Sequence, residues 1–234
     1  VDEVLLQKTV GTPGVPDIRI DPLTVSFNQQ SNRPIYVVLD WMEDGTHSHR
    51  PSQAVVDPIV QTFAAAGFQL NLDVSNAIPH QGTLAISNSP SASPAVQSLM
   101  SQHFNHAGDS RYYYSIWGHN YSYNGVTTTS SGIADLPGRI HLVSLGSFPG
   151  QTGTEDHQVG TFIHEFGHNL NQYHGGSDGE NYKPNYVSVM NYTPQFSSPA
   201  LRPLDYSRGA YGVLLPGGAI GLDKSNLNEV DGIG

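Results

Sequence analysis

The stretch from His164 to His174 constrains this chain more than any other, because it reads H-E-F-G-H-N-L-N-Q-Y-H. His164 and His168 are related as i and i+4, so on a helix both imidazoles project from one face about one turn apart. That separation lets two neutral nitrogens reach one zinc ion at roughly 2.0–2.1 Å. Glu165, beside the first histidine, can contact a metal-bound water without replacing it. The pattern therefore predicts a zinc-binding helix over residues 157–170.

A third zinc ligand is then required, and His174 cannot lie on the same straight helix face. The helix must end soon after His168 and let the chain turn back. Asn171 lies where that turn falls, and asparagine is, after glycine, the residue most tolerant of left-handed backbone angles. Gly175 and Gly176 then keep the chain out of helix. Three histidines leave one coordination position open, which is typical of a catalytic zinc site rather than a closed structural one.

The stretch resembles the motif of the metzincin clan of zinc endopeptidases, H-E-x-x-H-x-x-G-x-x-H followed by a methionine turn. His164, Glu165, His168 and His174 match that motif at the expected spacing. The one departure is Asn171, which stands where the clan usually has glycine. The resemblance implies a zinc endopeptidase whose substrate cleft runs between two subdomains.

A second match lies downstream, where residues 188–192 read S-V-M-N-Y and resemble the S-x-M-x-Y methionine turn of the astacin and serralysin branches. The resemblance implies that Met190 packs beneath the zinc site and that Tyr192 approaches the metal. Tyr192 is thus a candidate oxyanion donor, or a ligand that swings away from the metal, with a packed tyrosine near a turn as the rival interpretation. Residues 181–186 also resemble a group of bacterial metzincin-like proteases. These specific motifs cover residues 164–192.

The expected chemistry follows from a zinc ion held by three neutral histidines. Glu165 takes a proton from the zinc-bound water as it attacks a carbonyl, and delivers that proton to the leaving amine. A peptide bond is the natural target, so we expect a secreted zinc-dependent endopeptidase with a protein or peptide substrate. One alternative is a zinc hydrolase of glycopeptide or cell-wall peptide substrates. Another is a non-catalytic extracellular binding module in which zinc has a purely structural role. Glu165 argues against this alternative, because a structural zinc site needs no base.

Composition excludes several other functions. The formal net charge of −10 argues against nucleic acid as a partner, and it suits calcium as a second candidate cofactor beside zinc. There are no cysteines, which excludes disulfides and thiol catalysis and favours a bacterial secreted enzyme. No apolar run approaches the roughly 20 residues of a membrane span. No signal peptide is present at Val1, so we expect a mature or trimmed chain, with a propeptide absent from these residues as a candidate partner.

Hydrophobic patterning predicts a sheet with intervening helices. The fold class expected is α+β with an α/β-like N-terminal part: a metzincin-like, twisted mixed sheet with backing and active-site helices and a small irregular C-terminal subdomain. A single catalytic domain would span residues 1–234, with the sheet and zinc helix in 1–174 and the methionine turn in 175–234. The predicted strands cover 35–39, 68–74, 84–86, 112–117 and 139–145, and the other predicted helices cover 52–66, 94–105 and 225–230.

The remaining segments are expected to connect these elements. Residues 1–34 read as an extended arm, residues 118–132 as a long functional loop, and the strand over 139–145 as the one that closes the sheet. The helix after the first strand begins at either Ser52 or Asp57. Strand, helix and strand in that order imply a crossover and a parallel pair.

His47 and His49, beside Glu43 and Asp44, could form a second metal site. Solvent-exposed loops collect such residues freely, so an exposed loop without a metal is the preferred interpretation. The aromatic stretch over residues 117–123 either lines a substrate groove or covers the sheet, and the residue pattern leaves both open.

Three further groups of residues attract weaker interpretations. His103 and His106 are expected to form a surface pair, since no third ligand lies near them in sequence. His157 is expected to begin the zinc helix or to face the cleft. Asp178 and Glu180 are candidate calcium ligands, although no twelve-residue calcium-loop pattern is present.

Overall fold

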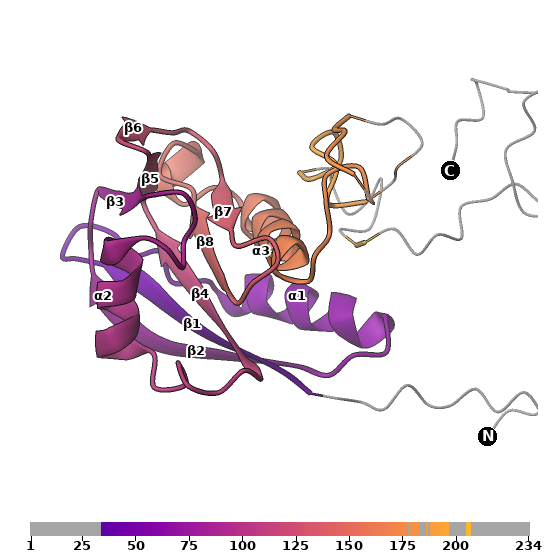
Figure 1. Ribbon diagram of the computed structural model, residues 1–234, viewed down its shortest axis with the longest axis horizontal. Coiled ribbons are helices and arrows are strands. Elements are labelled where there is room, and N and C mark those ends of the chain that lie inside the picture. The colour runs from indigo at the N-terminus through magenta and orange to yellow at the C-terminus, as the bar shows by residue number, and fades with distance from the viewer. Residues whose placement is uncertain (1–33, 177, 183–185, 187, 197–204, 207–234) are drawn as a thin grey trace, which may run out of the picture. The chain divides into compact units, whose positions relative to one another are not determined.

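The computed structural model describes residues 34–176, 178–182, 186, 188–196 and 205–206. The helix expected over 225–230 and all but the last residue of the expected N-terminal arm lie outside the described residues. The centre of the described part is a five-stranded sheet of order β2-β1-β4-β8-β7 (Figure 1). Its strands in that order are Leu70–Pro79, Ile35–Glu43, Tyr112–Gly118, Ile140–Ser144 and Gly132–Ala134.

The sheet is mixed, as the sequence predicted. Strand β1 pairs in parallel with β2 and with β4, and β4 pairs in parallel with β8. Strand β7 runs antiparallel to β8 and forms the edge. The expectation that the strand over 139–145 closes the sheet is therefore wrong, because the short Gly132–Ala134 segment lies outside it.

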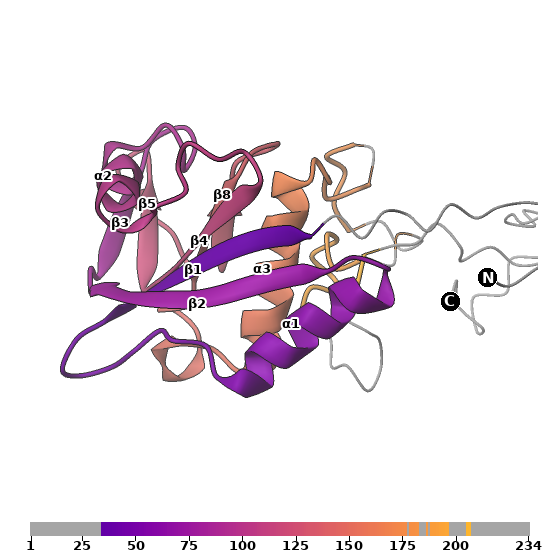
Figure 2. The same cartoon turned by 90° about the horizontal axis from the view of Figure 1, so that it is seen from below.

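Alternate residues of β1 point to opposite faces, each of which is covered. Val37 and Leu39 belong to a buried cluster with residues of α1 (Gln53–Ala65) and α3 (Glu155–Asn169). Val38 belongs to a second cluster with residues of α2 (Pro94–His103). Figure 2 shows α1 and α3 on one side of the sheet and α2 on the other.

Strand β1 was expected to end at Asp40 but runs on to Glu43. Asp40 is fully buried within it and accepts hydrogen bonds from the Tyr114 hydroxyl at 2.7 Å and the Asn76 backbone amide at 3.0 Å. Asn76 lies where the register between β1 and β2 shifts. A register shift leaves backbone groups outside the regular pairing of the two strands, so the Asn76 amide can donate to the Asp40 carboxylate. Burial, with the hydrogen bond to Asp40 second, raises the pKa of Tyr114 well above its usual range.

A second, three-stranded sheet of order β3-β5-β6 is formed by Thr83–Ile86, Asn120–Tyr123 and Val126–Thr127. The expectation of a loop over residues 118–132 is therefore wrong in most of its length. Asn124 and Gly125, with φ of 49° and 83°, connect β5 to β6 in the backbone conformation that two-residue hairpins favour. The aromatic stretch over 117–123 thus lies mainly in strands.

The helices agree with the sequence, apart from their ends. Helix α1 begins after Ser52 and not at Asp57, so Pro58 lies inside it. Helix α2 ends at His103, and a 3-10 turn (Pro149–Gln151) precedes α3. None of the helices in the described part of the chain has the length and apolar character needed to cross a membrane.

Candidate metal centre

The N-terminus of α3 is fixed by a reciprocal cap. The His157 backbone amide donates to the Thr154 hydroxyl at 3.3 Å, and the Thr154 amide donates to Nδ1 of His157 at 3.1 Å. Glu155 and Asp156 occupy the first turn, where negative charge favours a helix. The helix begins at Glu155, and His157 lies in its first turn as part of the cap, close to the first of the two interpretations that the sequence left open for it.

The C-terminus of α3 redirects the chain. Asn171 has a φ of 69°, the left-handed conformation expected at this position. The Gln172 amide donates to the carbonyl of Gly167 at 2.9 Å, and the Asn171 amide donates to the carbonyl of His168, also at 2.9 Å. This pair of bonds is the Schellman arrangement, which satisfies the last carbonyls of a helix. It turns the chain back, so that His174 reaches the histidines of the helix.

The ligand atoms of His164, His168 and His174 all lie within 4.8 Å of one another. Nδ1 of His164 lies 2.9 Å from the carbonyl of Val189, and Nδ1 of His168 lies 2.8 Å from the carbonyl of Gln172. A carbonyl only accepts, so both Nδ1 atoms carry the proton and both Nε2 atoms offer a lone pair. Nε2 of His168 lies 3.1 Å from Nε2 of His174. This set of three imidazole donors fits a zinc ion.

Glu165 is nearly inaccessible, with 5% of its surface exposed. It lies against the edge strand: a Cβ added to Gly132 would come within 2.6 Å of Cγ and 2.8 Å of Oε1 of Glu165. Burial raises the pKa of Glu165 to about 8. A cation held by the adjacent histidines would favour the ionised carboxylate. The buried carboxyl group of Glu165, which is next in sequence to His164, therefore lies against β7.

Two residues of the expected methionine turn lie against this site. Met190 is fully buried, and a Cβ added to Gly167 would come within 2.3 Å of its sulfur. The Tyr192 ring has its centroid 4.5 Å from that of His174 and 5.6 Å from that of His164. Tyr192 is 42% exposed, and burial of part of its ring raises its pKa. Its role in catalysis stays a prediction.

The remaining candidate residues lie elsewhere. The exposed-loop interpretation is wrong for His49, which is 5% exposed and gathers with three other histidines, His47 among them. The sequence missed the other two members, His80 and His119, because they lie far from His47 and His49 in the chain. The ring of His106 stacks on Tyr112 at 3.8 Å, away from any metal-capable group found among the described residues.

Calcium finds no support in the described part of the chain. The two metal-capable groups found there consist of histidines alone and include neither Asp178 nor Glu180. In this segment the Glu180 amide donates to the Asp178 carboxylate at 3.0 Å, as in an ordinary turn.

Comparisons with known proteins add little. No protein-family profile matches the chain, and no curated protein is similar to it. Among solved structures, archaemetzincin from Methanopyrus kandleri is similar with a TM-score of 0.46 and 16% identity, over 79% of this chain and 93% of that one. Metalloproteinase-II from Bacteroides fragilis has a TM-score of 0.41 and 13% identity, over 73% of this chain and 52% of that one. A zinc-dependent peptidase from Methanocorpusculum labreanum has a TM-score of 0.38 and 14% identity, over 73% of this chain and all (100%) of that one. At these values the likenesses assign neither a family nor a function to the chain.

Proposed function

We propose that this protein is a zinc-dependent hydrolase that cleaves peptide bonds as a secreted endopeptidase. The observation that carries the proposal is the convergence of His164, His168 and His174 beside the buried carboxylate of Glu165. Three imidazoles with an adjacent base form a catalytic donor set, whereas a structural zinc site has four protein ligands and needs no base. Secretion is supported by the absence of cysteine and the low share of charged residues, 13%.

Each residue of the site has a defined task. A zinc ion held by the three histidines supplies a Lewis acid that polarises a carbonyl group and acidifies water. Glu165 accepts the proton of the attacking water and returns it to the leaving amine, the work of a general base and then a general acid. Tyr192, beside His174 and partly exposed, can donate a hydrogen bond to the developing oxyanion.

The edge strand β7 favours an extended peptide as the substrate. The Ser144 amide donates to the carbonyl of Ser131, and the Asp135 amide donates to the carbonyl of Ile140. In an antiparallel pair such bonds involve alternate residues, so the backbone groups of Gly132 and Ala134 point away from β8. The Gly132 carbonyl already accepts from the Tyr121 hydroxyl at 3.1 Å, so a peptide that adds to this edge by main-chain hydrogen bonds would pair with the Gly132 amide and with Ala134. Gly132 also touches Glu165, which places that edge beside the catalytic carboxylate.

The test is hydrolysis of unfolded casein by the full chain, before and after o-phenanthroline and again after addition of zinc. We expect cleavage that the chelator abolishes and zinc restores. Glu165→Gln should retain its zinc and lose activity by on the order of 10²–10⁴-fold, the usual contribution of a general base. Glu155→Gln is the matched control, because Glu155 lies exposed in the first turn of the same helix.

The outcomes separate the alternatives. Cleavage of cell-wall peptides or glycopeptides without cleavage of casein would favour the narrower hydrolase. Undiminished activity of Glu165→Gln would refute the assigned base. Bound zinc without hydrolysis of any of these substrates would favour the binding module.

A further inference from the structure

Four histidines outside the site described above gather at one edge of the main sheet. His47 and His49 follow β1, His80 follows β2, and His119 follows β4. Strands β2, β1 and β4 are neighbours and parallel, so their carboxyl ends meet at the same edge. Residues separated widely in sequence are thus brought together by the topology of the sheet.

The ring nitrogens of this four-histidine cluster converge. One ligand atom from each of the four rings lies within 4.8 Å of the corresponding atoms of the other three. Nε2 of His47 lies 3.1 Å from Nδ1 of His119. The centroid of the His47 ring is 4.3 Å from that of His80 and 4.9 Å from that of His49. His49 and His80 lie nearly parallel, with ring centroids 5.6 Å apart, whereas every other pair of rings in the cluster meets edge to face.

Two of these nitrogens lack any partner. Nε2 of His49 and Nε2 of His80 are buried and make no hydrogen bond. A buried polar atom without a hydrogen-bond partner destabilises the fold, so two in one cluster are not expected without compensation. Neutral imidazoles also direct lone pairs toward one another when their acceptor nitrogens converge. A bound cation removes both penalties at once.

We propose that His47, His49, His80 and His119 form a second metal site, a closed four-coordinate site for zinc. Imidazole nitrogen is a preferred zinc ligand, and four protein ligands in tetrahedral arrangement are the mark of a structural site. This site has no open position for substrate and no place in the hydrolytic mechanism.

Asp44 completes the arrangement. Its carboxylate lies 3.3 Å from Nδ1 of His80 and 3.7 Å from Nδ1 of His47. In both rings Nε2, the other nitrogen, is therefore the one that can bind the ion. The Thr46 amide donates to that carboxylate at 2.7 Å and the Thr46 hydroxyl at 2.6 Å. A carboxylate behind a ligating histidine fixes the tautomer and offsets the charge of the ion.

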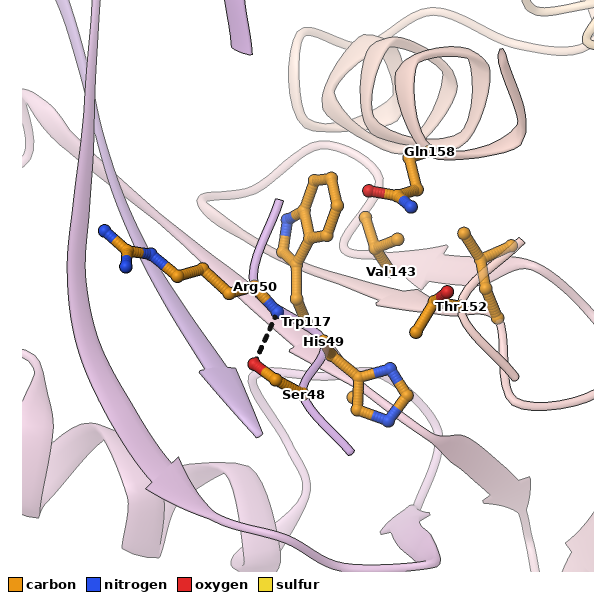
Figure 3. Close-up of a pocket in the computed structure, with 9 residues that line it drawn as sticks. Ser48, His49, Arg50, Trp117, Val143, Thr152 and Gln158 are labelled. Atoms are coloured by element: carbon orange, nitrogen blue, oxygen red, sulfur yellow. Dashed lines mark hydrogen bonds between the residues drawn. The ribbon is translucent and has the colours of Figure 1, made fainter. Parts of the chain in front are cut away.

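A small cavity of about 60 Å³ lies nearby but is distinct from this site. Figure 3 shows His49 at its wall with Trp117 and Val143. None of the other three histidines lines it. His49 therefore lines the cavity as well as belonging to the four-histidine cluster, and the cavity is not where the metal would bind.

The position of the site indicates what the ion would stabilise. His80 lies between β2 and β3, and His119 lies between β4 and β5, so both are on segments that pass from the main sheet to the small one. A shared ion would tie these two segments to the loop after β1. Strand β5 also carries Tyr121, whose hydroxyl donates to the carbonyl of Gly132 at 3.1 Å. An ion bound at this cluster would therefore also stabilise the position of the edge strand β7.

The zinc content of the purified full chain, measured by mass spectrometry of the metal after dialysis, tests this proposal. We expect two zinc ions per chain in the wild type, one for each histidine group. His47→Ala with His80→Ala should reduce the content to one. His103→Ala with His106→Ala is the matched control and should retain two, because neither residue belongs to either group.

The reciprocal variant keeps the test decisive even if removal of the cluster prevents folding. His168→Ala with His174→Ala disables the first site, and the chain should still bind one equivalent of zinc. Cobalt(II) in its place should give the strong visible absorption of tetrahedral coordination. One zinc ion in the wild type, two in the His47/His80 variant, or none in the reciprocal variant would overturn the proposal. None of these readouts requires hydrolysis, so a failed second site and a failed hydrolase assignment are distinguishable.

Discussion

Gly167 and Met190 are packed so closely that a methyl group at position 167 would come within 2.3 Å of the methionine sulfur. The same methyl group would come within 2.7 Å of Cε1 of Tyr206. Gly167 lies one residue before His168 on α3, so the side chain of Met190 supports the helix backbone directly beneath a proposed zinc ligand. The hydroxyl of Tyr206 donates to the carbonyl of Ile163 at 2.6 Å, which supports the helix backbone next to His164.

Gly167→Ala should therefore destabilise the fold and weaken zinc binding together. Overpacking of this kind costs about 1–3 kcal/mol. Urea unfolding and competition with a chelating dye measure the two effects. Gly108→Ala is the control, since an added Cβ there would meet nothing within 4 Å. An unchanged zinc affinity in Gly167→Ala would mean that Met190 does not hold the ligands in place.

Asn171 offers a second test at the end of the same helix, because its φ is 69°. Asn171→Gly should retain or slightly raise stability, since glycine adopts this conformation without strain. Asn171→Val should cost about 1–2 kcal/mol, the penalty of left-handed backbone for an ordinary residue, and should lower zinc affinity by displacing His174. Equal stability and zinc affinity of the two variants would show that the turn does not depend on this position.

Local patterns predicted much of the fold. The β-branched run at residues 35–39 forms the first part of β1, and the H-E-x-x-H spacing located α3 to within a few residues. Such signals are local, since they depend on propensity and on the period of apolar residues. The Asn124-Gly125 pair, a strong hairpin signal, could have revealed β5 and β6, but the polar composition around it favoured a loop.

The four-histidine cluster shows what local patterns miss. His80 and His119 carry no neighbouring motif, and only the strand order brings them to His47 and His49. Each histidine follows a parallel strand, so the rule that carboxyl ends of parallel strands meet at one edge was the available signal. Using it required knowing that β2, β1 and β4 are adjacent. Strand β7 was missed for a related reason, because three residues are too short to show a period.

Tyr192→Phe tests the proposed oxyanion donor. If the hydroxyl stabilises the transition state, kcat should fall by on the order of 10²–10³-fold with little change in KM, and the zinc content should not change. Tyr123→Phe is the control, because Tyr123 is 39% exposed and its hydroxyl donates to the carbonyl of Asn88 in a different part of the fold. A kcat within twofold of the wild type would assign Tyr192 to packing alone.

His141 should make folding sensitive to acid. Its ring is fully buried, and Nδ1 lies 2.9 Å from Oδ1 of Asn169. The Asn169 amide nitrogen donates to the carbonyls of Asp135 and Ile140, each at 3.0 Å, so its oxygen is the acceptor and His141 Nδ1 carries the proton. Nε2 is buried without a partner, and burial lowers the pKa of His141 from 6.5 to about 4.

The sign of the effect follows from these two values. Between pH 4 and 6.5 the unfolded chain binds a proton at this residue that the folded chain does not, so acidification favours unfolding. His141 contributes a constant stability above about pH 7, and that stability falls by up to about 1.4 kcal/mol per pH unit across the window. Urea unfolding at several pH values should show a shallower decline for His141→Asn, which keeps a donor near Asn169. Parallel declines for the two proteins would contradict this assignment.

Gly146 provides a test of the second metal site that leaves all of its ligands intact. A Cβ added there would come within 2.5 Å of Cδ2 and 2.7 Å of the carbonyl oxygen of His119, the oxygen to which the Gly146 amide donates at 2.7 Å. Gly146→Ala should therefore displace the His119 ring and reduce the zinc content by one ion per chain. Gly82→Ala, near His80 but with nothing within 4 Å of the added Cβ, should retain both ions.

The same variant also separates the two sites by function. His164, His168 and His174 are untouched by Gly146→Ala, so the ion retained should be the one that supports hydrolysis of casein. We expect the thermal midpoint to fall in Gly146→Ala, because the segments after β2 and β4 would lose their shared ion. Full zinc content in Gly146→Ala would show that His119 is not needed as a ligand. Loss of both ions would show that the two sites depend on each other, because Tyr121 and Gly132 link the strand after His119 to the edge beside Glu165.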